Sequence, residues 1–175
     1  MRLGLNTNLA VLFNGDTFHL AFSSRQPADP TYDILGRRTP AHLTAMGKVL
    51  LAELPFEEVR QNIERNGWRP RTPRSIQDFN TLQRELETIR QQGFGLDLWE
   101  SSNACCVACP IRRKDGTVVA AISATTRVSS LENYLANLDS VLQAVFQTAA
   151  SISYQIDYLG EAYMIRPRLL IKPQL

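Results

Sequence analysis

Three cysteines within residues 105–109 are the most chemically reactive side chains of this sequence. Cys106 and Cys109 form a Cys-x-x-Cys pair, the spacing of a redox dithiol or of half a zinc site. A zinc site needs about four ligands, but no second pair exists, and the only histidines are His19 and His42. A redox pair usually begins a helix, whereas this segment is strand-like. Buried thiols in a core or pocket wall are therefore favoured. The alternative is a cytosolic thiol-redox or metal-binding protein that uses Cys105, Cys106 and Cys109.

The start of a helix predicted over residues 44–54 is a candidate anion site. Thr44 stands where its hydroxyl can cap the first backbone N–H groups, and small residues follow it. Free N–H groups and the positive end of the helix dipole can hold a small anion there. The same small residues also suit a helix that packs closely against its neighbours. The sequence alone leaves both interpretations open.

Polar residues on predicted strands are further candidates. Ser123 and Thr125 alternate with apolar neighbours, so their hydroxyls share one face, which meets either a small-molecule pocket or solvent. Asp97 and Glu100 lie three apart on a strand-like segment, so they are expected on opposite faces, with Glu100 in solvent. They make a poor acid–base pair. The sequence also lacks a Gly-x-Ser-x-Gly elbow and a glycine-rich phosphate loop. It therefore predicts no catalytic residue.

Composition narrows the class of protein. The 175 residues suffice for one domain with a substantial core, and 44% of them are hydrophobic. The net charge of +2 gives no strong field toward nucleic acid or membrane. A short patch of Arg69, Arg71 and Arg74 beside Trp68 lies in a proline-broken segment and is expected to be a solvated loop. A protein that binds nucleic acid directly stays open as an alternative, but the charge and the short patch give it little support.

Three further properties of the sequence bear on the cellular compartment of the protein. No run of about 18 apolar residues is present, so no membrane span is expected. The first residues lack an apolar stretch of signal-peptide length. An odd number of closely spaced cysteines fits a reducing compartment. We therefore expect a cytoplasmic protein.

The apolar pattern predicts an α+β domain. The predicted strands cover residues 8–13, 17–22, 32–35, 95–101, 105–112 and 117–126. The predicted helices cover residues 44–54, 57–66, 75–92 and 131–156. The order strands, helices, strands, helix favours an antiparallel sheet over a doubly wound parallel one.

Capping signals mark two of these helices. Ser75–Asp78 and Ser129–Glu132 resemble capping boxes, and Gly93 is a natural C-cap. The last helix carries one long apolar stripe and should lie across the sheet. Beyond Gly160 the pattern fades, so residues 1–157 are expected to form the domain and residues 158–175 a basic tail.

Three segments, in their order and spacing, resemble the effector-binding domain of IclR-type bacterial transcriptional regulators. Gly36–Ala52 fits Gly-Arg-x-x-Pro-x-His-x-x-x-x-Gly-Lys-x-x-Leu-Ala. Glu85–Glu100 resembles Glu-Leu-x-x-x-Arg-x-x-Gly-Tyr-x-x-Asp-x-x-Glu, with Phe94 for Tyr. Cys106–Ile111 resembles Cys-Ile-Ala-x-Pro-Val. The resemblance covers about residues 5–156.

The resemblance implies a GAF-like fold, an antiparallel sheet flanked by helices, with a pocket for a small metabolite. The positions that contact the ligand in the family correspond to Ala45, Met46, Asp97, Cys106, Ser123 and Thr125. Backbone N–H groups near Ala45 and Met46 would bind a carboxylate. Asp97, Ser123 and Thr125 would bond hydroxyl or keto groups, and Cys106 would line the wall. Met46 is bulkier than the residue usual there, which implies a narrower pocket.

The resemblance also implies a ligand sensor rather than an enzyme, without cofactor or metal. The expected effector is a small organic acid that controls operator binding by a homodimer or homotetramer. DNA contact would need the family's winged helix-turn-helix domain, which precedes the effector domain and is absent from these 175 residues.

Overall fold

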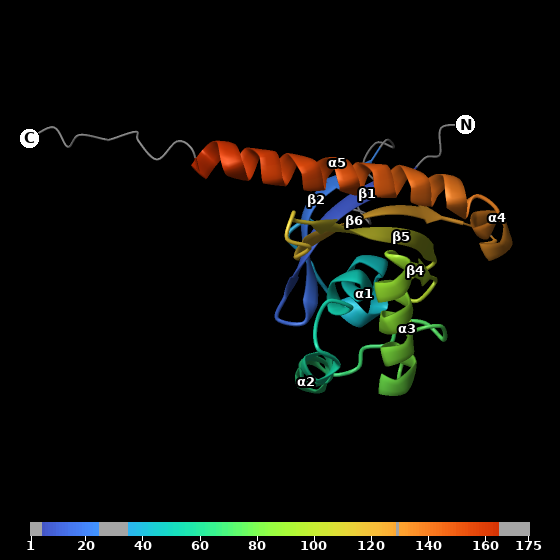
Figure 1. Ribbon diagram of the computed structural model, residues 1–175. Helices are drawn as coiled ribbons and strands as arrows, with labels where there is room; N and C mark the ends of the chain where they lie inside the picture. Colours follow the sequence, from blue (N-terminus) through green and yellow to red (C-terminus); the bar gives the residue numbers. More distant parts are fainter. Residues whose placement is uncertain (1–4, 25–34, 129, 165–175) are drawn as a thin grey trace, which may run out of the picture.

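A six-stranded antiparallel sheet separates two layers of helices in the computed structural model, which describes residues 5–24, 35–128 and 130–164 (Figure 1). The strand order is β3-β2-β1-β6-β5-β4. The strands are β1 (Asn6–Phe13), β2 (Asp16–Ser23), β3 (Arg38–Pro40), β4 (Gly95–Leu98), β5 (Ala104–Arg112) and β6 (Val118–Arg127). The helices are the 3-10 turn η2 (Ala41–Leu43), α1 (Ala45–Leu51), α2 (Phe56–Asn66), α3 (Phe79–Gln92), α4 (Leu131–Leu135) and α5 (Leu138–Met164). The α+β fold with an antiparallel sheet is confirmed.

The first hairpin forms as its sequence predicts. Asn14 and Gly15 both have positive φ, 51° and 79°, which suits a tight turn between twisted strands. The third strand differs from the prediction. Residues 32–34 lie outside the described residues, and Leu35 is in a turn. The strand that pairs with β2 is Arg38–Pro40, directly before η2.

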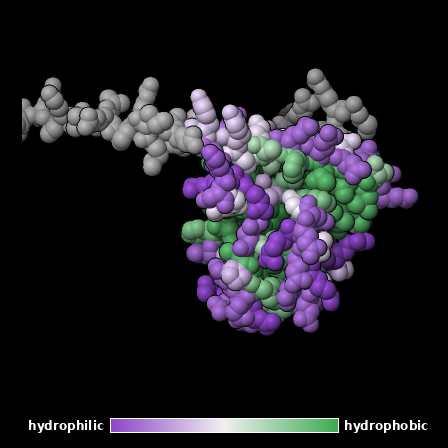
Figure 2. Space-filling model, viewed as in Figure 1, coloured by the Kyte–Doolittle hydropathy of each residue, from purple (hydrophilic) through white to green (hydrophobic). Residues whose placement is uncertain are grey.

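Side-chain alternation gives the sheet two different faces. On one face, Val107, Cys109 and Ile122 pack against α5 through its stripe of Val141 and Val145. Helix α1 covers the other face, where small strand residues such as Ala10, Ala108 and Ala121 meet it, and α3 and α2 lie beyond α1 (Figure 1). Figure 2 shows hydrophilic residues over most of the visible face, with hydrophobic residues coming to the surface in its upper right part. In the described residues, no helix is long and apolar enough to span a membrane.

Helix α1 lies unusually close to its neighbours because of Gly47. A Cβ on this glycine would stand 2.2 Å from the carbonyl oxygen of Ala41 and 2.5 Å from the hydroxyl of Thr17. Gly95 on β4 is a second close approach, 3.0 Å from the carbonyl oxygen of Ala45. The small residues of this segment therefore serve close packing.

The start of α3 corrects the first capping box. Asp78 is the N-cap, and its carboxylate accepts from the N–H of Thr81 at 2.8 Å. Ser75 instead joins two loops: its hydroxyl accepts from the N–H of Thr72 and donates to the carbonyl of Glu100 at 2.7 Å. Gly93 ends the helix with φ 81°, as predicted.

The last helix is broken into α4 and α5. Ser130 caps α4, whereas Ser129 lies outside the described residues. The side-chain amide of Asn137 donates to the carbonyl of Asn133 at 2.9 Å, and this local bond competes with continuation of the helix. The break lets Tyr134 be buried while α5 crosses the sheet. Helix α5 then continues past the expected boundary at residue 157 to Met164.

Candidate functional site

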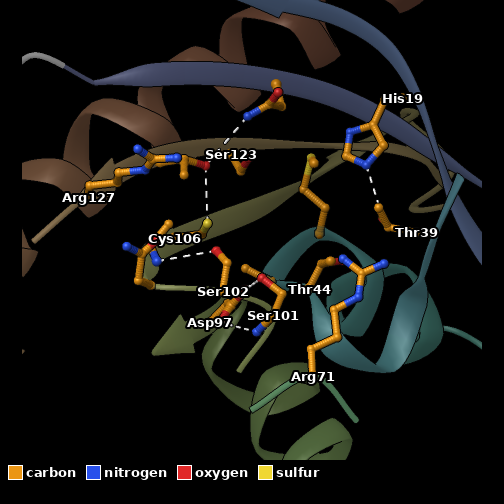
Figure 3. A pocket seen from close by; sticks show the side chains of 16 residues that line it. His19, Thr39, Thr44, Arg71, Asp97, Ser101, Ser102, Cys106, Ser123 and Arg127 are labelled. Carbon is orange, nitrogen blue, oxygen red and sulfur yellow. Dashed lines mark hydrogen bonds between the residues drawn. The ribbon is translucent and has the colours of Figure 1, made fainter. Parts of the chain in front are cut away.

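A cavity of about 240 Å³ lies between the sheet, the start of α1 and the turn that joins β4 to β5. Six of the residues that line it are those the sequence singled out: Ala45, Met46, Asp97, Cys106, Ser123 and Thr125. Figure 3 shows how Asp97 and Ser101 face it from one side, with His19 and Ser123 on the sheet opposite. The structure brings the six residues together, while their contact with a ligand stays a prediction.

Strand register builds the cavity floor. Thr125 on β6 pairs with Cys106 on β5, and Cys106 pairs in turn with Asp97 on β4. Two residues before Thr125 on β6, Ser123 stands opposite Asn8 on β1. The Cys106 thiol lies 3.1 Å from the Thr125 hydroxyl. Because a strand repeats every two residues, these polar groups share the face that α1 covers.

Thr44 shapes the α1 side of the cavity. Its hydroxyl accepts from the N–H of Gly47 at 3.0 Å, so it is the N-cap that its position predicts. The Thr17 hydroxyl contacts it at 3.2 Å. The N–H groups of Ala45 and Met46, in the first turn of the helix, have no acceptor within the helix. Both residues line the cavity.

Asp97 holds the turn at the far side. Its Oδ1 accepts from the N–H groups of Glu100 and Ser101 at 2.7 and 3.3 Å, and the Ser101 hydroxyl donates to Oδ2. Burial raises the pKa of Asp97, although these hydrogen bonds and Lys48 oppose the shift. Asp97 is therefore both a cavity wall and the anchor of the turn that carries Ser101 and Ser102.

The expectation of a solvated Glu100 is wrong. Strand β4 ends at Leu98, and Trp99 takes a left-handed φ of 67°, so the strand alternation stops there. Glu100 turns inward and accepts from the ammonium of Lys48 at 2.7 Å. Lys48, whose side chain is 1% exposed, also donates to Glu85 on α3 at 3.0 Å. Burial raises the pKa of Glu100 despite Lys48. This ion cluster ties α1, α3 and the turn together directly behind the cavity.

The cysteines do not converge on one site. Cys106 lines the cavity, but Cys109 packs into the core under α5, because residues three apart on a strand face opposite sides. Burial raises the pKa of both Cys105 and Cys109 to about 11, the reverse of an activated thiol. In the described part of the chain, no group of three or more His, Cys, Asp or Glu side chains could hold a metal. The thiol-redox or metal-binding alternative receives no support.

The sequence interpretation missed several residues of the cavity, among them Asn8, His19 and Arg71. Asn8 and His19 lie on β1 and β2, and Arg71 reaches the cavity from the loop expected to be purely solvated (Figure 3). The Nε2 of His19 lies 3.0 Å from the Thr39 hydroxyl, and burial lowers its pKa to about 4, so the ring is neutral at pH 7. The alternation of Asn6 and Asn8 before Ala10 was a signal for a polar end of β1. Nothing local indicated Arg71.

Residues 1–154 match the family of bacterial transcriptional regulators described as IclR C-terminal. The chain belongs to the IclR family. It corresponds to the C-terminal, effector-binding part of these regulators, which are not enzymes. The HTH-type transcriptional regulator XynR of Escherichia coli is 31% identical over 159 residues, which is 90% of this chain. The chain spans 62% of the length of XynR.

Solved structures show the same IclR effector-domain fold. One is the inducer-binding domain of a PobR double mutant from Acinetobacter in complex with 3-hydroxybenzoic acid, with TM-score 0.77 and 28% identity, over 86% of this chain and 89% of that one. Another is an IclR homologue from Microbacterium hydrocarbonoxydans in complex with 4-hydroxybenzoate, with TM-score 0.71 and 25% identity, over 85% and 59% of the two chains. Domains of this family thus bind small molecules.

Proposed function

We propose that this IclR effector domain binds a small organic acid in the 240 Å³ cavity and thereby controls operator binding by the regulator to which it belongs. The observation that carries the proposal is the placement of cationic and N–H donor groups around one cavity. Arg71 and Arg127 line the cavity together with the first N–H groups of α1. The one acidic side chain among the lining residues, Asp97, already accepts hydrogen bonds from its own turn.

The ligand contacts follow from this arrangement. A carboxylate would accept hydrogen bonds from the N–H groups of Ala45 and Met46 and from the guanidinium of Arg71. Ser123 and Thr125 would bond polar groups at the other end of the ligand, and Cys106 would lie against its carbon chain. Asp97 contributes mainly by holding the turn closed over the site.

The structure also supports a mechanism for the signal. A ligand between the start of α1 and the turn after β4 would touch two elements that the Lys48–Glu100 ion pair joins, and Lys48 also binds Glu85 on α3. The ligand would therefore favour one placement of α1 and α3 over another. In the oligomer, the change in the placement of α1 and α3 would alter how the DNA-binding domains are positioned.

Self-association is the second part of the proposal. Phe146, Tyr154 and Tyr158 are exposed on α5, although α5 is the helix that covers a whole sheet face. Large aromatic side chains in solvent are typical of a protein contact. We propose that α5 meets a second copy of the chain in a cytoplasmic homodimer or homotetramer. Sedimentation of the wild type and of Tyr154→Glu tests this, because the wild type should be at least dimeric and the variant smaller.

Isothermal titration with paired ligands tests acid binding. A carboxylic acid should bind, and the amide made from the same acid should bind at least tenfold more weakly. Arg71→Gln should weaken binding of the acid about tenfold, because charge-assisted hydrogen bonds contribute about 1.5–3 kcal/mol. Arg65→Gln on the exposed side of α2 is the matched control. Equal affinities for acids and amides would contradict the proposal.

A further inference from the structure

We infer that the effector is a polyhydroxylated open-chain acid, with hydroxyl groups on adjacent carbons, rather than an aromatic acid with a single hydroxyl. The inference rests on the proposed function and narrows its ligand class. It is carried by polar groups on the sheet floor of the cavity that have no hydrogen-bond partner among the described residues.

Three such groups lie on neighbouring strands. They are Oδ1 of Asn8 on β1, Nδ1 of His19 on β2 and Oγ of Ser123 on β6. The three residues line the cavity and are only 6%, 3% and 1% exposed. Buried polar groups in native proteins almost always have hydrogen-bond partners. Three unpartnered ones beside one cavity indicate that a ligand supplies the missing bonds.

The chemistry of these groups requires a ligand with protons to donate. The amide oxygen of Asn8 only accepts hydrogen bonds, and a carboxylate has no proton to give it. In the tautomer whose Nε2–H donates to the Thr39 hydroxyl, Nδ1 of the neutral His19 ring accepts a hydrogen bond, and the Ser123 hydroxyl can accept one as well. One hydroxyl donates one proton and can satisfy one of these acceptors. A ligand that pairs with all three therefore carries more than one hydroxyl.

The positions of the three groups fit a row of hydroxyls. Asn8 and Ser123 are direct cross-strand partners, so their side chains leave the sheet side by side. His19 stands one strand further along, next to Ala10 in the register of β1 with β2. Figure 3 shows His19 and Ser123 on the same side of the cavity, with Arg71 across from them. A chain anchored by its carboxylate near Arg71 could thus place successive hydroxyls along the floor.

The walls lack the surfaces that aromatic ligands use. Among the described residues that line the cavity, none is Phe, Tyr or Trp. Hydroxyl and amide side chains dominate instead, among them Thr39, Thr44, Ser101, Ser102 and Asn103. Sites for flat apolar ligands are lined mainly by hydrophobic and aromatic side chains. A polyhydroxy acid finds hydrogen-bond partners on the sheet floor and on the turn of Ser101 and Ser102, whereas a benzene ring would cover them.

Calorimetric titration of the 175-residue chain with matched acids tests the inference. The panel contains aldonic acids of four to six carbons in both C2 configurations and their 2-keto derivatives. Butyrate and hexanoate serve as deoxygenated partners, and 4-hydroxybenzoate as the aromatic acid. We expect at least one polyhydroxy acid to bind tenfold or more tightly than its deoxygenated partner and than 4-hydroxybenzoate.

Variants of the sheet floor test where that acid binds. Ser123→Ala and Asn8→Leu should each weaken binding of the polyhydroxy acid about five- to tenfold without changing hexanoate binding. Ser140→Ala, exposed on α5, is the control.

Each other outcome has a distinct meaning. If 4-hydroxybenzoate or a deoxygenated acid binds more tightly than every polyhydroxy acid, the inferred class is wrong while acid binding stands. If a polyhydroxy acid binds tightly but Ser123→Ala and Asn8→Leu leave its affinity unchanged, the assignment to the sheet floor is overturned. If no carboxylate binds at all, the proposed function fails, and the inference fails with it.

Discussion

The two faces of the sheet share the same strands but differ in what they bury. Toward α5, strands β5 and β6 present Val107, Cys109, Ile122 and Ala124 to an apolar helix. Toward α1, the alternate residues of these strands include Cys106, Ser123 and Thr125, which line a cavity. A shift of one residue along a strand thus separates a closed core from a polar hollow.

The difference shows how the fold divides its tasks. The α5 face gains stability from continuous apolar burial. The α1 face carries a buried lysine, two shielded carboxylates and two neutral histidines, and three of its cavity-lining residues have a polar atom without a partner in the described part of the chain. Such groups cost stability unless something pairs with them, which is a usual feature of binding sites. Four substitutions or titrations test this contrast.

Gly47→Ala should have the largest effect. Its methyl group would collide with backbone atoms of Ala41 at 2.2 and 2.4 Å, which cannot move aside as a flexible side chain would. We expect a loss of about 4 kcal/mol or more in the free energy of unfolding. Urea unfolding measures it. Gly116→Ala, at a hairpin turn with φ 88° and no atom within 4 Å of the new Cβ, should lose only about 1–2 kcal/mol. Similar losses would show that close packing of α1 is not the reason for Gly47.

Lys48→Met should cause the second-largest loss in the free energy of unfolding. The substitution leaves the carboxylates of Glu85 and Glu100 facing each other without their shared cation. We expect a loss of about 3 kcal/mol at pH 7. Adding Glu100→Gln should restore part of it, since one of the two unpaired charges is then removed. A double variant as unstable as the single one would contradict the role of the charge and point to packing alone.

The pH dependence should come from the α1 side. Burial lowers the pKa of His42 to about 4, and its ring meets Trp68 edge-on with centroids 5.0 Å apart. The unfolded chain binds this proton near pH 6.5, so the stability from His42 is present above that pH and is lost as the pH falls toward 4. Between pH 7 and pH 4, the free energy of unfolding should therefore fall about 2–3 kcal/mol less in His42→Phe than in the wild type. Thermal unfolding at several pH values measures this, and parallel curves for the two proteins would refute it.

The smallest expected difference in stability comes from the same change, cysteine to serine, made once on each face of the sheet. Cys109→Ser places a hydroxyl in the apolar core under α5 and should cost about 1–2 kcal/mol. Cys106→Ser places it in the cavity beside the Thr125 hydroxyl, so its cost should stay below about 0.5 kcal/mol. Chemical denaturation of both variants tests the difference. Equal losses would mean that the two faces are energetically alike.

Local signals made part of this site predictable. Thr44 caps α1 and Gly93 ends α3 as the sequence indicates, because capping depends on residues within one turn. Ser123 and Thr125 share a face because strand alternation is also local. The prediction for Glu100 is wrong because it extends the alternation past Leu98, where the left-handed Trp99 ends the strand.

The sequence by itself determined the family, the α+β class, the strand and helix order and six residues that come together around one cavity. Local periodicity and capping chemistry are sufficient for the fold class and the order of elements, whereas the family and the set of six residues come from the resemblance of three motifs to IclR regulators. Only the tertiary structure decided that Asn8, His19 and Arg71 line the same cavity. It also decided that Lys48 binds Glu85 and Glu100. The opposite placement of Cys106 and Cys109, one in the cavity and one in the core under α5, is likewise a property of the folded sheet. These contacts mostly join segments far apart in the chain, and they depend on strand register and on how closely α1 approaches the sheet. Those properties emerge only when the layers pack.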